Sequence, residues 1–108
     1  MGYIKHHAIV VTSYDKGKCE AAHGYAASLF DTQVTPLLLS PVNGFYSFFI
    51  GPDGSKEGWI DSDRGDGRRA DFINYIYDQR FEDNSNALSY AEFYYGEDNG
   101  RAAIEAHN

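Results

Sequence analysis

The chain has 108 residues, of which 16 are Asp or Glu and 9 are Lys or Arg, so its formal net charge at pH 7 is -7. This length predicts a single domain, residues 1–108, built around one core. Apolar residues make up 43% of the chain, which excludes a wholly disordered protein because such chains cannot bury enough surface to offset ordering entropy. The acidic balance argues against direct nucleic-acid binding, which depends on Lys and Arg.

Membrane attachment and secretion are not indicated by the sequence. No apolar run approaches the roughly 18 residues of a membrane span, and the N-terminus lacks a signal-peptide pattern. Cys19 is the only cysteine, which excludes an internal disulfide and favours a reducing compartment. We therefore expect a cytoplasmic protein.

The first predicted elements are a strand over residues 3–12 and a helix over 16–30. The strand contains the β-branched run at 9–12, which is typical of a central strand. The helix has apolar residues at three- and four-residue spacing, with an Ala-rich contact face suited to close packing on a sheet. Ser13 or Asp15 is expected to cap its start.

The middle of the chain predicts three short strands. Residues 37–40 lie between two prolines, which lack the ladder donor and so favour an edge strand. Asn43-Gly44 is typical of a tight turn leading into a strand over 45–50. Residues 56–60 are expected to return as a hairpin arm.

The second half predicts a polar loop at 61–67, a helix from about 67 to 81 capped by Asp66, and a strand over 88–95. A short closing strand near 102–106 is also indicated. The order predicts an α+β fold, a ferredoxin-like β-α-β-β-α-β sandwich. In that arrangement two helices cover one face of an antiparallel sheet, here with a possible extra C-terminal hairpin strand, and the other face is open or covered by a partner.

A ligand site is predicted around the only locally basic segment. Arg64, Arg68 and Arg69 lie at the expected helix start, where free amides and the helix dipole favour an anion such as a phosphate-bearing small molecule. The aromatic and histidine side chains expected to complete this site are Trp59, Tyr90 and His7. The competing interpretation is ordinary salt bridging of the arginines to Asp61, Asp63 or Glu82.

No catalytic residue, metal site or cofactor is predicted. His6 and His7 are adjacent on a strand and point to opposite faces, so one ion cannot readily use both. Residues 61–67 have the acidic spacing with which a calcium loop begins, but Phe72 stands where a bidentate Glu is needed. Cys19 lies on the predicted buried helix face, where a thiol is inert.

Aromatic residues make up 16% of the chain and are concentrated in the strands and the second helix. Tyr and Trp are enriched where proteins bind partners. The predicted interface residues are Tyr46, Phe48, Tyr94 and Tyr95, and a homodimer is the expected assembly.

Two segments carry a family resemblance: YIKHHAIVVTS ahead of the Ala-rich helix, and VNGFYSFFIGPDGSKEGW downstream. They resemble small uncharacterised proteins encoded by bacteriophages, and the likeness spans most of the chain. The resemblance implies the cytoplasm of an infected bacterium and an accessory, host-directed role. It transfers no functional residue.

The sequence therefore favours a non-enzymatic binding or accessory protein that engages a host protein or a small ligand. One alternative is a cofactor-free enzyme of the dimeric α+β-barrel type, with His7, His23, Trp59 and Tyr90 as its candidate residues. Another is an acidic mimic of nucleic acid. A nucleic-acid mimic would need its acidic residues to form one continuous stripe on the protein surface. The candidates for that stripe are Asp61, Asp63, Asp83, Glu97 and Asp98.

Overall fold

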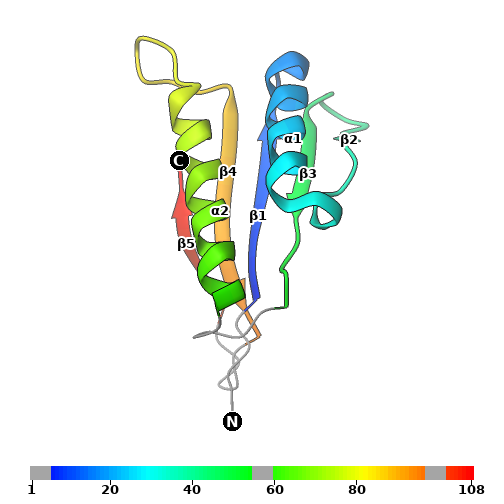
Figure 1. The fold of residues 1–108 in the computed structure, drawn as a ribbon. Helices are drawn as coiled ribbons and strands as arrows, with labels where there is room; N and C mark the ends of the chain where they lie inside the picture. The colour runs from blue at the N-terminus through cyan, green and yellow to red at the C-terminus, as the bar shows by residue number, and fades with distance from the viewer. Residues whose placement is uncertain (1–5, 55–59, 97–101) are drawn as a thin grey trace.

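The computed structural model describes residues 6–54, 60–96 and 102–108 (Figure 1). Within them the chain forms an α+β fold of two α-helices and a five-stranded antiparallel sheet, which confirms the predicted class. The elements in chain order are β1 His6–Ser13, α1 Lys16–Phe30, a short 3-10 helix Asp31–Gln33, β2 Leu38–Leu39, β3 Tyr46–Ile50, α2 Ile60–Asp78, β4 Leu88–Tyr95 and β5 Ala103–His107.

The sheet has the strand order β2-β3-β1-β4-β5, and every neighbouring pair is antiparallel. β1 lies at the centre, where Val11 is paired with Phe48 of β3 and with Tyr90 of β4. The closing strand predicted near the C-terminus is present as β5. Both helices lie on the same side of the sheet, as Figure 1 shows, so within the described residues no helix covers the opposite face.

The core fills the space between the helices and the sheet. The Ala-rich face of α1 predicted from the sequence is there, because Cys19, Ala22 and Ala26 are all fully buried. Asp15 caps this helix: its side chain accepts a hydrogen bond from the backbone N–H of Lys18. The sheet and α2 complete the core with Ile9, Val11, Phe48, Ile50, Leu88, Tyr90, Phe72 and Ile76.

The second helix corrects the sequence prediction. α2 begins at Ile60 and ends at Asp78, so the polar loop expected at 61–67 is helical and Asp66 is not its cap. Asp61 and Asp63 lie in the first turn, where carboxylates stabilise the helix dipole. The predicted hairpin arm over 56–60 is wrong at Ile60, because Ile60 is helical. Residues 56–59 of that arm lie outside the described part of the chain. Residues 3–5 of the first predicted strand lie outside it as well.

Neither helix in the described part of the chain carries an apolar stretch long enough to cross a bilayer.

Candidate functional site

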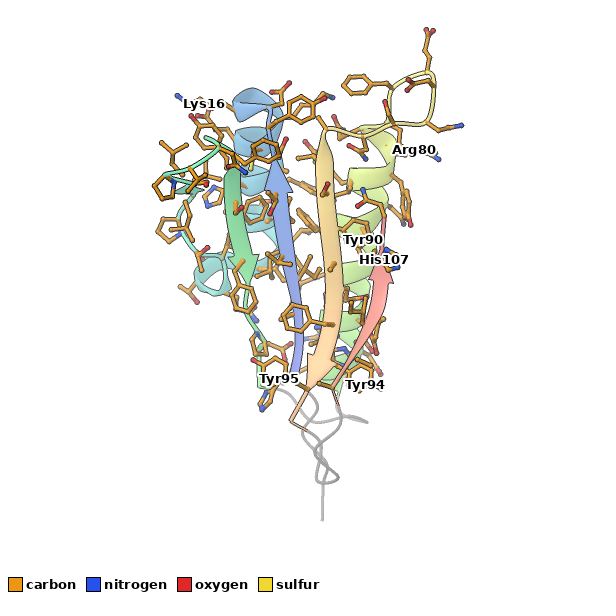
Figure 2. All side chains as sticks on the ribbon, turned by 180° about the vertical axis from the view of Figure 1, so that it is seen from behind. Lys16, Arg80, Tyr90, Tyr94, Tyr95 and His107 are labelled. Atoms are coloured by element: carbon orange, nitrogen blue, oxygen red, sulfur yellow. The ribbon has the colours of Figure 1, made fainter. Side chains whose placement is uncertain are left out.

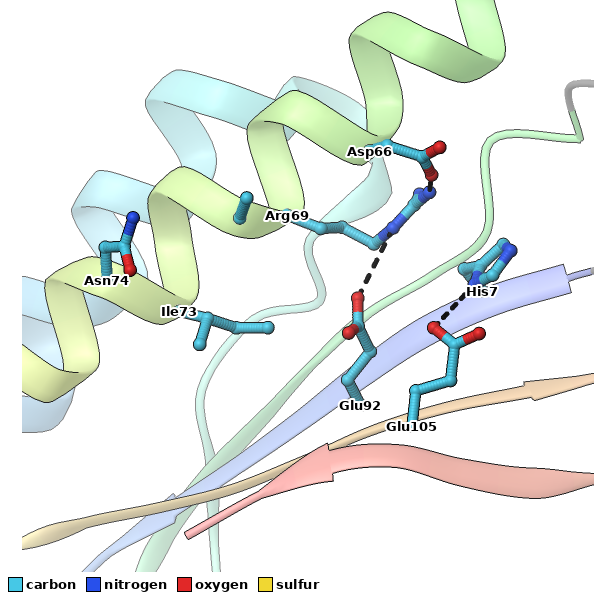
Figure 3. A pocket seen from close by; sticks show the side chains of 8 residues that line it. His7, Asp66, Arg69, Ile73, Asn74, Glu92 and Glu105 are labelled. Carbon is cyan, nitrogen blue, oxygen red and sulfur yellow. Dashed lines mark hydrogen bonds and ion pairs between the residues drawn. The ribbon is translucent and has the colours of Figure 1, made fainter. Parts of the chain in front are cut away.

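A pocket of about 490 Å³ lies between α2 and the strands β1, β4 and β5 (Figure 3). Six of the eight residues that line it are polar or charged, and the other two are Ala70 and Ile73 on α2. The polar residues that line it are His7, Asp66, Arg69, Asn74, Glu92 and Glu105.

Strand alternation brings two of these residues to the helix-covered side of the sheet. On β1, His7 lies on the same face as the buried Ile9 and Val11. On β4, Glu92 continues the face that begins with the buried residues Leu88 and Tyr90. The pocket therefore lies where the apolar core gives way to polar side chains.

A β-bulge supplies the second glutamate. The register of β4 and β5 shifts between Glu92, which is paired with Ala106, and Phe93, which is paired with Ile104. Glu105 is the extra residue between these two partners. A bulge changes the direction of a side chain relative to a regular strand, and here the Glu105 side chain lines the pocket.

Arg69 forms one ion pair that connects α2 to the sheet and another within α2 itself. Its Nε lies 3.5 Å from Oε2 of Glu92, and its Nη2 donates a hydrogen bond to Oδ1 of Asp66 (Figure 3). The side chains of Arg69 and Glu92 are only 9% and 12% exposed, whereas Asp66 is 60% exposed. The buried pair is therefore the one between helix and strand.

Gly65 makes room for this arrangement. A Cβ at this position would lie 2.7 Å from Oδ2 of Asp53 and 3.4 Å from Nη1 of Arg69. Glycine leaves space for both side chains at the end of α2 nearest the pocket.

The electrostatic environment of Glu92 is set by burial and by charged side chains that share the pocket. Burial raises the pKa of Glu92, the nearby carboxylates Glu105 and Asp66 raise it further, and Arg69 opposes the shift. Glu105 lies beside His7: its Oε2 is 3.3 Å from Nδ1 of His7, within ion-pair distance, but Nδ1 makes no hydrogen bond in the described structure. Three carboxylates thus face one guanidinium and one imidazole.

Of the six residues predicted to bind a ligand, the structure brings His7 and Arg69 together in this pocket. Arg64 is exposed, with Nη1 3.9 Å from Oδ1 of Asp61, as the salt-bridge interpretation expected. Arg68 is half-buried and does not line the pocket. Tyr90 is buried and donates a hydrogen bond to the Tyr77 hydroxyl at 3.2 Å. Trp59 lies outside the described residues.

The physical basis of the predicted anion site is wrong. It required the free backbone amides of a helix start beside Arg64 and Arg68, but both residues lie in α2 beyond its first four N–H groups. The same helix removes the loop that was compared with a calcium site. Among the residues that the structure describes, no three His, Cys, Asp or Glu side chains form a group that could hold a metal ion.

Sequence reasoning missed Asp66, Asn74, Glu92 and Glu105 as pocket residues. A signal existed for Glu92, because it occupies the third position of the buried face that Leu88 and Tyr90 define on β4. No comparable signal existed for Glu105, whose direction depends on the bulge.

Other candidate residues have structural partners elsewhere. Nε2 of His23 lies 2.8 Å from the carbonyl oxygen of Thr35, and its ring packs edge-on against Phe48. The acidic stripe required of a nucleic-acid mimic is not formed by its described members, because Asp61 and Asp63 begin α2 and Asp83 follows its other end. Glu97 and Asp98 lie outside the described residues.

The predicted interface residues separate onto two faces. Phe48 is buried in the core, and Tyr46 packs against it. Tyr94 is paired with His7 on the helix side of the sheet, and their ring centroids are 6.3 Å apart. Of the four, only Tyr95 lies on the face without helices.

That face, which we call the open sheet face, is seen from the front in Figure 2. Its aromatic members are in contact: Phe93 lies 6.3 Å from Phe49 and 6.0 Å from Tyr95, between ring centroids. Strand register assigns to it the side chains of Leu38, Ser47, Phe49, His6, Ala8, Val10, Thr12, Ser89, Ala91, Phe93, Tyr95, Ile104 and His107.

Comparison of the chain with protein-family models, with curated proteins and with solved structures finds no match in any of the three. The resemblance to bacteriophage proteins stays a prediction.

Proposed function

We propose that this chain is a non-enzymatic binding protein whose ligand is a small organic cation held in the pocket between α2 and the sheet. The observation that carries the proposal is the excess of carboxylates in a cavity: Asp66, Glu92 and Glu105 against the single guanidinium of Arg69. The volume of about 490 Å³ lies within the range of small-molecule sites.

The charge distribution favours a cation over a phosphate-bearing ligand. Arg69 is already paired with Asp66 and Glu92, so its charge is largely satisfied within the chain. An incoming phosphate would meet three carboxylates, whereas an ammonium or guanidinium group would gain a favourable interaction with them. Ile73 and Ala70 offer apolar contact for a short methylene stem.

Calorimetric titration with three ligands of equal stem length tests this proposal: butylammonium, butylguanidinium and butyl phosphate. The cations are expected to bind and the phosphate is not. Glu105→Gln should weaken cation binding about tenfold, the loss of one charged contact worth about 1.4 kcal/mol.

Glu20→Gln is the matched control, because Glu20 is an exposed carboxylate on α1 that pairs with Lys16 and does not line the pocket. The proposal fails if butyl phosphate binds as tightly as the cations, if neither cation binds, or if both Gln variants change affinity equally.

One observation favours a cofactor-free enzyme as the second candidate. Glu92 has a raised pKa in a cavity that also contains His7, and perturbed carboxyl groups in pockets are typical of acid–base catalysis. Against it, His23 and Tyr90 are engaged outside this pocket. New NMR resonances appearing during the cation titrations would reveal turnover and favour the enzyme.

We also propose that the fold is a ferredoxin-like arrangement extended by one strand. The chain order of β1, α1, β2, β3, α2 and β4 supports this assignment, as do the two helices on one sheet face. β5 is the departure from it, and β5 supplies Glu105 to the pocket. The bacteriophage resemblance adds the expectation of an accessory role in a bacterial cytoplasm.

A further inference from the structure

We propose that the open sheet face is an interface through which two copies of this chain associate face to face. This proposal is independent of the pocket, which lies on the other side of the sheet. The face is not covered by either helix (Figure 2).

Charge is the first reason for choosing a second copy as the occupant. The chain carries 16 acidic and 9 basic residues, yet the described side chains that form the open sheet face include no Asp, Glu, Lys or Arg. Two such faces can meet without burying a charge, which is the costly step in most associations. A charged partner would find no complementary group here.

Aromatic packing is the second reason. Phe49, Phe93 and Tyr95 form a contacting row across β3 and β4, which is the kind of rigid apolar centre that dominates protein interfaces. Val10 and Ile104 flank this row and are 37% and 64% exposed. Together they leave an apolar patch on the protein surface that a second sheet would remove from water.

The area of the face is small, which favours a weak association. The five strands contain 8, 2, 5, 8 and 5 residues. At a rise of about 3.3 Å per residue and a strand spacing of about 4.8 Å, they cover about 450 Å². Two faces would bury about 900 Å², below the roughly 1,000 Å² expected of a stable specific complex, so we expect a weak, reversible dimer.

Sedimentation equilibrium of the full chain over a concentration series tests the interface. The wild-type chain is expected to show a reversible monomer–dimer equilibrium. Ile104→Glu introduces a charge at an exposed position of the face and should leave the chain monomeric. Phe93→Ala should weaken the dimer at least tenfold.

Matched controls distinguish this face from general surface hydrophobicity. Val42→Glu and Phe81→Ala change exposed apolar residues outside the sheet, 94% and 43% exposed, and should leave the dissociation constant unchanged. Circular dichroism verifies that each variant is folded. A chain that is monomeric at every concentration overturns the proposal, as does a dimer that Ile104→Glu leaves intact or that Val42→Glu weakens equally.

Discussion

Replacing Arg69 by methionine removes the cation beside Glu92 while keeping a long side chain in the same space. In the native protein the two groups are 3.5 Å apart and almost fully buried. Without Arg69, Glu92 must either keep its charge among Glu105 and Asp66 or take up a proton. We therefore expect the Arg69→Met chain to be markedly less stable at neutral pH.

The cost of protonation sets the upper limit of this loss. A carboxyl group with the ordinary pKa of 4.5 takes up a proton at pH 7 at a cost of about 3.4 kcal/mol, and at pH 5 at a cost of about 0.7 kcal/mol. The loss in unfolding free energy should therefore be at most about 3 kcal/mol at pH 7, within the range found when other buried ion pairs are broken. It should shrink to below about 1 kcal/mol at pH 5.

The sign follows from proton linkage. The pKa of Glu92 is raised in the folded protein, so the folded state binds the proton more tightly and stability falls as the pH rises above 4.5. Removing Arg69 raises this pKa further, so the fall in stability continues to a higher pH.

Urea unfolding followed by far-UV circular dichroism at the two pH values measures the effect. Arg69→Met/Glu92→Gln should recover most of the lost stability, because it removes the unpaired charge. Arg64→Met should change little at either pH, since Arg64 is exposed and pairs only at 3.9 Å. An Arg69→Met loss that is equal at pH 5 and pH 7 would contradict the ion-pair explanation and assign the effect to packing.

Two further predictions concern the helices. Gly24→Ala and Gly67→Ala should each stabilise the protein by about 0.5–1 kcal/mol, because an added Cβ meets no atom within 4 Å. Gly65→Ala should bring no gain in stability, because its Cβ would lie 2.7 Å from Oδ2 of Asp53. Equal gains in the free energy of unfolding, measured with urea, at all three positions would contradict this. Burial raises the pKa of the Cys19 thiol, so a thiol reagent at neutral pH should modify Cys19 only in denaturant. Rapid modification of the folded chain would contradict this expectation.

The regular elements were predictable where one local pattern dominates. The spacing of Cys19, Ala22 and Ala26 predicted the buried face of α1, and the strand predicted over 88–95 is present as β4 with the same bounds. In both cases the period of the apolar residues matches the period of the backbone. Local sequence is then sufficient.

The start of α2 and the pocket could not be predicted in this way. Residues 61–67 combine charged side chains with two glycines, a composition of low helix propensity. The helix there is supported by contacts distant in sequence: Gly65 packs beside Asp53, and Arg69 reaches Glu92 on β4. The side chain of Glu105 depends on a bulge whose position the sequence does not reveal.

The shortest strand has a consequence for how these molecules behave at high concentration. β2 has only two residues, lies at one edge of the sheet and is followed within two positions by Pro41. An edge this brief presents few backbone donors and acceptors to a neighbouring chain, and proline offers no N–H at all. Strand-by-strand polymerisation from this edge is therefore blocked, which protects the protein against fibrous aggregation on that side.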